Sequence, residues 1–118
     1  MLKLGQLKDL KTNDIWMKCY DWGATPEDKN RFKILVAYIN EGDWGCDSSG
    51  YFLLQEKTTG KYFEVYGSHC SCYGFEDQWT PRQATLKYLK SSHFTHNIGG
   101  YDEVTGTTTV SEWIKENL

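Results

Sequence analysis

Cysteine and histidine side chains gather in two short segments of this 118-residue chain. Cys46 lies in the first segment, and His69, Cys70 and Cys72 lie in the second. Three thiolates and one imidazole form a common tetrahedral zinc set. A bound metal also stabilises the folded state of a domain with a limited core. The residue types therefore predict a zinc site made of Cys46, His69, Cys70 and Cys72.

A predicted β-hairpin positions these two segments. Residues 51–57 and 61–66 are rich in strand-forming side chains, and they flank Thr58-Thr59-Gly60. A three-residue loop with glycine last is a favoured hairpin connection, and it pairs Lys57 with Lys61. The same register continues along both strands, where it pairs Cys46 with Cys72 and Ser48 with Cys70. Even-numbered residues of the two strands then share one face, so that three thiols converge.

The fourth zinc ligand has several candidates. His69 is the nearest, although a regular strand points its side chain away from that of Cys70. The alternatives are Cys19, His93 and His96. Structural zinc sites usually place about two to four residues between paired cysteines, whereas Cys70 and Cys72 have one between them. The competing interpretation is a set of buried thiols that act as small hydrophobic side chains.

A cysteine hydrolase is a further interpretation of the same residues. A nucleophilic thiol needs an imidazole within hydrogen-bond reach and a third group that orients this imidazole. His93 or His96 could act as the base, with Asp77 or Asp102 as the orienting group. No segment matches a known nucleophile motif. We therefore expect a binding protein and not an enzyme.

The predicted loops also carry aromatic and acidic side chains, which are Trp44, Phe75, Glu76, Asp77 and Trp79. A large aromatic side chain in a loop either packs on the core or contacts a partner, and tryptophan and tyrosine dominate interface hot spots. Core packing is the commoner role. The alternative is that these residues form a partner-binding surface.

The whole chain, residues 1–118, is predicted to form a single α+β domain. We expect a small antiparallel sheet of about three to five strands around the central hairpin, with about two or three short helices on one face. The other expected elements are a short helix within residues 1–10, strands at 14–21 and 32–40, and helices that follow Thr80 and Thr109. Thr80 precedes Pro81, and Thr109 begins a capping box that ends at Glu112.

Charge and hydropathy narrow the possible classes of function. Lys and Arg number 13 against 16 Asp and Glu, and the net charge is −3. This charge argues against general nucleic-acid binding, which depends on basic side chains. No apolar run approaches the roughly 20 residues that cross a membrane, and Lys3, Lys8 and Asp9 interrupt any secretory leader. We expect a soluble, cytoplasmic protein, a monomer or weak dimer, in which clustered cysteines indicate metal binding before disulfides.

The segment from Tyr62 to Trp79 resembles a family of small proteins encoded by phages and prophages of Gram-positive bacteria. In that family a hairpin leads into a Ser-His-Cys-Ser-Cys-Tyr-Gly run and a following tryptophan, which correspond here to residues 68–74 and Trp79. The resemblance covers residues from about Gly45 to Leu89. The size, mild acidity and cysteine cluster are also similar to those of type II-A anti-CRISPR proteins, some of which bind metal.

The resemblance implies a counter-defence protein that acts in the host bacterial cell. Such a protein binds a host defence protein, here the RNA-guided effector nuclease of a type II CRISPR system, and blocks DNA loading or cleavage without catalysis. The residues carried over by the resemblance are His69, Cys70, Cys72 and Cys46. The alternatives are a zinc-stapled structural or regulatory phage domain and, after it, the Cys-His hydrolase.

Overall fold

A computed structural model describes residues 2–5, 15–40, 48–69, 77–98 and 108–118. Five strands form one sheet in the order β1-β2-β3-β4-β5. The strands are β1 (Leu2–Gly5), β2 (Phe32–Asn40), β3 (Ser48–Glu56), β4 (Tyr62–His69) and β5 (Arg82–Ala84). Strand β1 runs parallel to β2, and every other neighbouring pair is antiparallel. The predicted α+β class is confirmed, with one parallel pair added at the edge.

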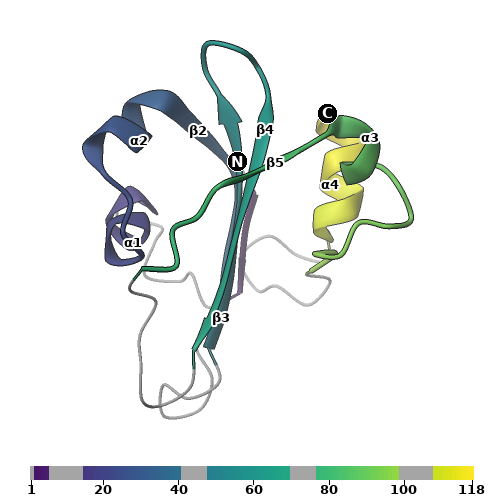
Figure 1. Cartoon of the computed structure of the whole chain (residues 1–118). Helices are drawn as coiled ribbons and strands as arrows, with labels where there is room; N and C mark the ends of the chain where they lie inside the picture. Colours follow the sequence, from purple (N-terminus) through teal and green to yellow (C-terminus); the bar gives the residue numbers. More distant parts are fainter. Residues whose placement is uncertain (1, 6–14, 41–47, 70–76, 99–107) are drawn as a thin grey trace.

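Helices cover both faces of this sheet, as Figure 1 shows. Helices α1 (Ile15–Asp21) and α2 (Pro26–Arg31) lie on one side, and α3 (Leu86–Leu89) and α4 (Val110–Asn117) lie on the other. The prediction of helices on one face was wrong. The reason is visible in β3, where Tyr51, Phe52, Leu53 and Leu54 are all 0 % exposed. Successive side chains of a strand point to opposite faces, so an unbroken apolar run requires cover on both.

Two predictions near the N-terminus were wrong, since a strand stands where a helix was predicted and a helix stands where a strand was predicted. Residues 2–5 form strand β1 and not a helix, since Leu2 pairs with Val36 and is buried in the core. Residues 15–21 form helix α1 and not a strand. Ile15, Cys19 and Trp22 recur at the spacing of one helical face, and all three are buried. Strand-forming side chains are thus used here on a helix because the helical spacing buries them together.

The C-terminal half contains one wrong prediction and one that is confirmed. The helix expected after Thr80 does not begin there, because residues 82–84 extend along β4 as edge strand β5. Helix α3 begins later, where the Thr85 hydroxyl accepts the Tyr88 N–H. Helix α4 begins at the predicted capping box, in which Thr109 and Glu112 bind each other's backbone N–H groups.

Helix α2 is not among the elements predicted from the sequence. Its N-terminus has two ordinary signals. The Thr25 hydroxyl accepts the Asp28 N–H and the Asp28 side chain accepts the Thr25 N–H, with Pro26 at the start of the helix. Helices α1 and α2 form the crossover between parallel strands β1 and β2.

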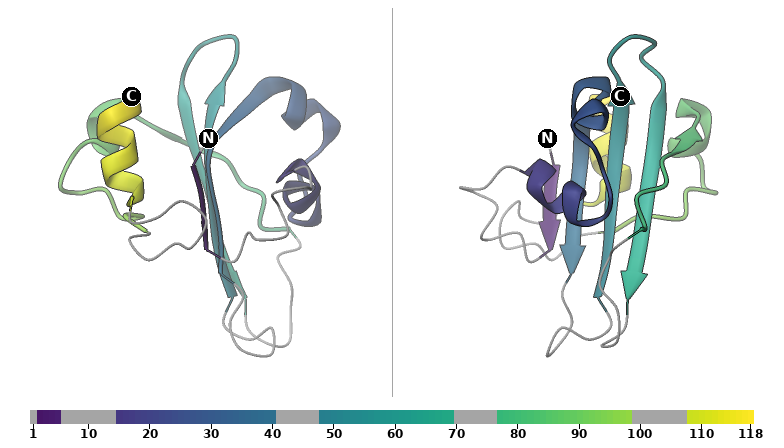
Figure 2. Two further views of the ribbon diagram at one scale, coloured as in Figure 1. Left: turned by 180° about the vertical axis from the view of Figure 1, so that it is seen from behind. Right: turned by 60° about the vertical axis from the view of Figure 1, so that its left-hand side comes forward.

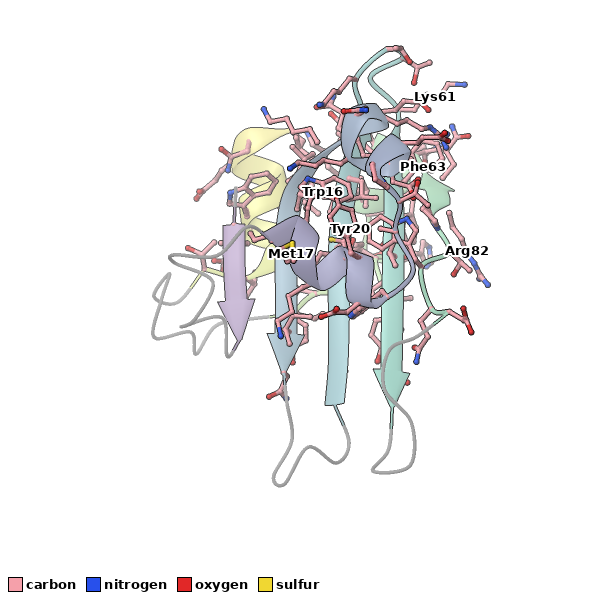
Figure 3. All side chains as sticks on the ribbon, turned by 90° about the vertical axis from the view of Figure 1, so that its left-hand side faces the viewer. Trp16, Met17, Tyr20, Lys61, Phe63 and Arg82 are labelled. Carbon is pink, nitrogen blue, oxygen red and sulfur yellow. The ribbon has the colours of Figure 1, made fainter. Side chains whose placement is uncertain are left out.

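The sheet separates two hydrophobic clusters. The first lies under α1 and α2 and includes Trp16, Trp22 and Phe52. The second lies under α3 and α4 and includes Tyr51, Leu89 and Ile114. Figure 3 shows α1 lying across the first face of the sheet and carrying Trp16, Met17 and Tyr20. Within the described ranges, no helix is both long and apolar enough to cross a membrane.

Candidate functional site

The register of the central hairpin differs by one residue from the predicted register. Ser48 pairs with His69, and at the other end the Glu56 N–H donates to the Lys61 carbonyl over 2.8 Å. Residues 57–60 therefore form the turn, with Gly60 in the left-handed region at φ 74°. The Lys57 N–H points to the other side, where it donates to the Arg31 carbonyl over 2.9 Å and continues the pairing of β2 with β3 beyond Phe32 and Glu56.

Side-chain contacts reinforce this turn. The Glu56 carboxylate accepts hydrogen bonds from the Thr59 hydroxyl and from the Arg31 guanidinium. These two donors hold the pKa of Glu56 below its ordinary value, the Thr59 hydrogen bond being the larger cause. The guanidinium of Arg31 also lies 4.5 Å from the centre of the Phe32 ring. Helix α2 is thereby tied to the hairpin turn.

The register bears directly on the predicted zinc site. The predicted pairing of Ser48 with Cys70 was wrong, because Ser48 pairs with His69. In the observed ladder an even-numbered residue of β3 shares its face with an odd-numbered residue of β4, as Phe52 does with Val65. Convergence of the thiols consequently no longer follows from the hairpin register. The cysteines at 46, 70 and 72, together with Trp44, Phe75 and Glu76, lie outside the described residues.

The described residues that flank the cysteine segments meet at one end of the sheet. Asn40 at the end of β2 pairs with Ser49, and Ser48 pairs with His69 at the end of β4. This is the lower end of the sheet in Figure 1. Two chain segments, residues 41–47 and 70–76, are therefore attached to the same end of the sheet.

The return from the second segment is fixed by the side chain of Gln78. Its Oε1 accepts the Ser68 N–H at 2.8 Å, and its Nε2 donates to the Ser68 carbonyl at 2.9 Å. The side-chain amide thus pairs with the edge of β4 as a neighbouring strand would. The next residue, Trp79, donates its N–H to the Trp22 carbonyl over 3.0 Å. Asp77, which precedes these anchors, is exposed and has a left-handed backbone with φ 62°.

Trp79 itself packs mainly on the core. Its ring centre lies 5.9 Å from that of Trp16 and 5.9 Å from that of Phe52. The indole Nε1 is buried and makes no hydrogen bond to any described residue. Of the two residues of the predicted partner surface that the structure describes, Asp77 is thus exposed and Trp79 is half-buried.

The alternative ligands and catalytic groups lie on opposite faces of the sheet. Cys19 is fully buried in the cluster under α1 and α2. His96 stacks against Tyr51 and Tyr66 on the side of α3, and His93 is exposed in the turn after α3. Cys19 and His96 therefore cannot join in one metal site or in one thiol–imidazole pair. Within the part of the chain that the structure describes, no three metal-ligating side chains come together.

No protein-family model, no curated protein and no solved structure matches this chain.

Proposed function

We propose that this protein is a phage-encoded inhibitor that binds a host defence protein, namely the effector nuclease of a type II CRISPR system. It acts without catalysis and blocks the loading or cleavage of DNA. The proposal is motivated by the resemblance of residues 62–79 to a phage protein family. It draws structural support from the way in which the residues around that segment are held.

The observation that carries this proposal is that Asp77 is exposed beside two anchored residues. This exposed carboxylate directly precedes two residues that are fixed to the body of the protein, Gln78 on Ser68 and Trp79 on Trp22. Its left-handed backbone adds a local constraint, and aspartate tolerates this conformation better than most residues. An acidic group held in place costs less conformational entropy when a partner binds.

The chemistry of the partner fits this presentation. An RNA-guided nuclease holds nucleic acid in positively charged channels. A protein of net charge −3 is attracted to such a surface and competes with DNA for it. The affinity of this contact should therefore fall as the salt concentration rises.

The test is a titration of the protein into an effector–guide complex, with association measured by calorimetry and target cleavage measured on a labelled duplex. We expect association and loss of cleavage. Asp77→Asn removes the charge but keeps a residue that tolerates left-handed backbone, and it should weaken association. Glu116→Gln, which removes an exposed acid of α4 on the opposite face of the sheet, is the matched control and should leave association unchanged.

Two results would contradict the proposal. One is the absence of both association and inhibition with the wild-type protein. The other is equal loss of affinity in Asp77→Asn and Glu116→Gln, which would show a dependence on net charge alone.

Zinc belongs to the same proposal as a structural element. A zinc ion would bind cysteines of the two segments and fix both segments to the end of the sheet where Ser48 pairs with His69. It would shape the binding surface and take no part in chemistry. The alternative function, a zinc-stapled structural or regulatory domain, differs only in its partner.

A further inference from the structure

The face of the sheet under α3 contains a cavity of about 620 Å³. Strand β4 contributes Glu64 and Tyr66 to its lining, and Arg82 comes from β5. Tyr88 of α3 and His96 of the following segment also line it. This side of the sheet is the one opposite α1 and α2, as Figure 2 shows. The volume lies within the range of about 300–1,000 Å³ that is usual for small-molecule sites.

Stacked rings form one wall of the cavity. The His96 ring centre lies 4.9 Å from that of Tyr51 and 4.9 Å from that of Tyr66, with interplanar angles of 29° and 24°. Tyr51 is fully buried, whereas Tyr66 is 48 % exposed and borders the cavity. Exposure of a large aromatic side chain that is already fixed by stacking favours a planar ligand.

A carboxylate with spare hydrogen-bonding capacity lies beside this wall. The Tyr51 hydroxyl donates to Oε2 of Glu64 over 2.7 Å, and Oε1 accepts no hydrogen bond from the described residues. Burial, followed by the negative charge of Glu64, raises the pKa of Tyr51 well above its ordinary value. Tyr51 therefore stays protonated and orients Glu64 as an acceptor for N–H groups.

A guanidinium lies on the same side. Arg82 pairs with Glu64 across β4 and β5, so both side chains emerge on one face of the sheet. Both line the cavity, yet no ion pair joins them and none links Arg82 to another residue in the described ranges. An acceptor and a cation are thus available side by side next to an aromatic ring.

We propose that this cavity binds a guanine nucleotide. The base stacks against the exposed ring of Tyr66, which His96 supports from its other side. Its ring N–H and amino group donate to Glu64, and its phosphate binds Arg82. Carboxylates accept hydrogen bonds from the amino groups of bases, and arginine matches the geometry of phosphate. A mononucleotide needs one well-placed cation, whereas long nucleic acids need many, so the site is compatible with a net charge of −3. This inference is independent of the proposed partner protein.

The test is calorimetric titration of the full-length protein with guanosine 5′-monophosphate. We expect saturable binding that weakens about tenfold or more for guanosine, which lacks the phosphate, and for adenosine 5′-monophosphate, which lacks the paired donors. Glu64→Gln and Arg82→Gln should each weaken binding by a similar factor. Lys87→Gln, which removes an exposed cation of α3 outside the cavity, should leave the affinity unchanged.

Tyr66→Ala keeps the test decisive if Glu64→Gln lowers stability through Tyr51. The Tyr66 ring is half-exposed, so its removal should weaken binding while the melting temperature changes little. Absence of saturable binding by the wild-type protein would overturn the proposal. So would variants of Tyr66 and Arg82 that bind within twofold of the Lys87→Gln control.

Discussion

Gly50 and Gly67 face each other across β3 and β4, and the ring of Trp22 lies over both. A Cβ atom at Gly50 would lie 2.5 Å from Trp22 Cζ2, and one at Gly67 would lie 2.8 Å from Trp22 Cζ3. Because neither glycine has a side chain, the fully buried Trp22 indole can pack directly on the backbone of both strands. The Trp22 carbonyl in turn holds the Trp79 N–H, so the glycine pair also positions the segment that follows Asp77.

The first prediction concerns Gly50, one of the two glycines under Trp22. Gly50→Ala should lower the free energy of unfolding by about 1–3 kcal/mol, because Trp22 and Ile39 must move away from the added methyl group. Gly60→Asn is the control, since a Cβ there meets nothing closer than 3.9 Å and asparagine tolerates positive φ. Chemical denaturation measures both variants. Equal stability of Gly50→Ala and wild type would show that Trp22 does not pack closely on Gly50.

The second prediction concerns the Gln78 side chain. Gln78→Ala removes both hydrogen bonds to the Ser68 backbone and should cost about 1 kcal/mol of stability, because Ser68 lies at an exposed edge where water replaces the amide. The local effect should be larger than the global one. Hydrogen exchange at the Ser68 N–H should accelerate, while exchange at the central β3 amides should change only as much as global stability does. Unchanged exchange at Ser68 would contradict the pairing.

Elements with local signals could be predicted from the sequence. Thr109 and Glu112 form a capping box within one helical turn, so α4 begins where the spacing indicates. The buried strand at residues 32–40 matches β2 because a continuous apolar run is bounded by polar residues. Helix α1 could also have been predicted, since Ile15, Cys19 and Trp22 have helical spacing. The strand propensity of the individual residues favoured the wrong prediction.

Features that depend on distant contacts could not be predicted. The hairpin turn contacts a distant segment, since the Arg31 carbonyl accepts the Lys57 N–H and the Arg31 side chain donates to Glu56. The stacking of His96 on Tyr51 and Tyr66 joins three segments that no sequence spacing relates. The cavity beside them depends on the same long-range packing, and the sequence therefore gave no sign of it.

The third prediction concerns alkaline pH. The pKa of Tyr51 is raised in the folded protein by burial and by Glu64, while in the unfolded chain it is near 10. The contribution of Tyr51 to the free energy of unfolding is fully present below about pH 10. Above this pH it falls by about 1.4 kcal/mol per pH unit, because the unfolded state loses a proton that the folded state keeps. Tyr51→Phe should remove this part of the alkaline loss, whereas Tyr66→Phe should not.

Tyr51→Phe has an opposite effect at neutral pH. It removes a hydrogen bond to a carboxylate and should lower stability by about 1.5–3 kcal/mol there. The two stability curves should therefore approach each other above about pH 10. Denaturation at several pH values measures this convergence, and parallel curves would contradict the assignment to Tyr51.

The fourth prediction tests zinc at the end of the sheet where Ser48 pairs with His69. Elemental analysis of the untagged protein should find about one equivalent of zinc, since three thiolates and an imidazole complete one tetrahedral site. Cys70→Ser and Cys72→Ser should each abolish metal binding. Each should also lower the free energy of unfolding by roughly several kcal/mol, because the free energy of metal binding stabilises the folded state. Ser71→Ala changes the residue between them, keeps every thiol and should keep the metal. Less than about one-tenth of an equivalent in wild type, or an unchanged melting temperature in both cysteine variants, would rule out a native site.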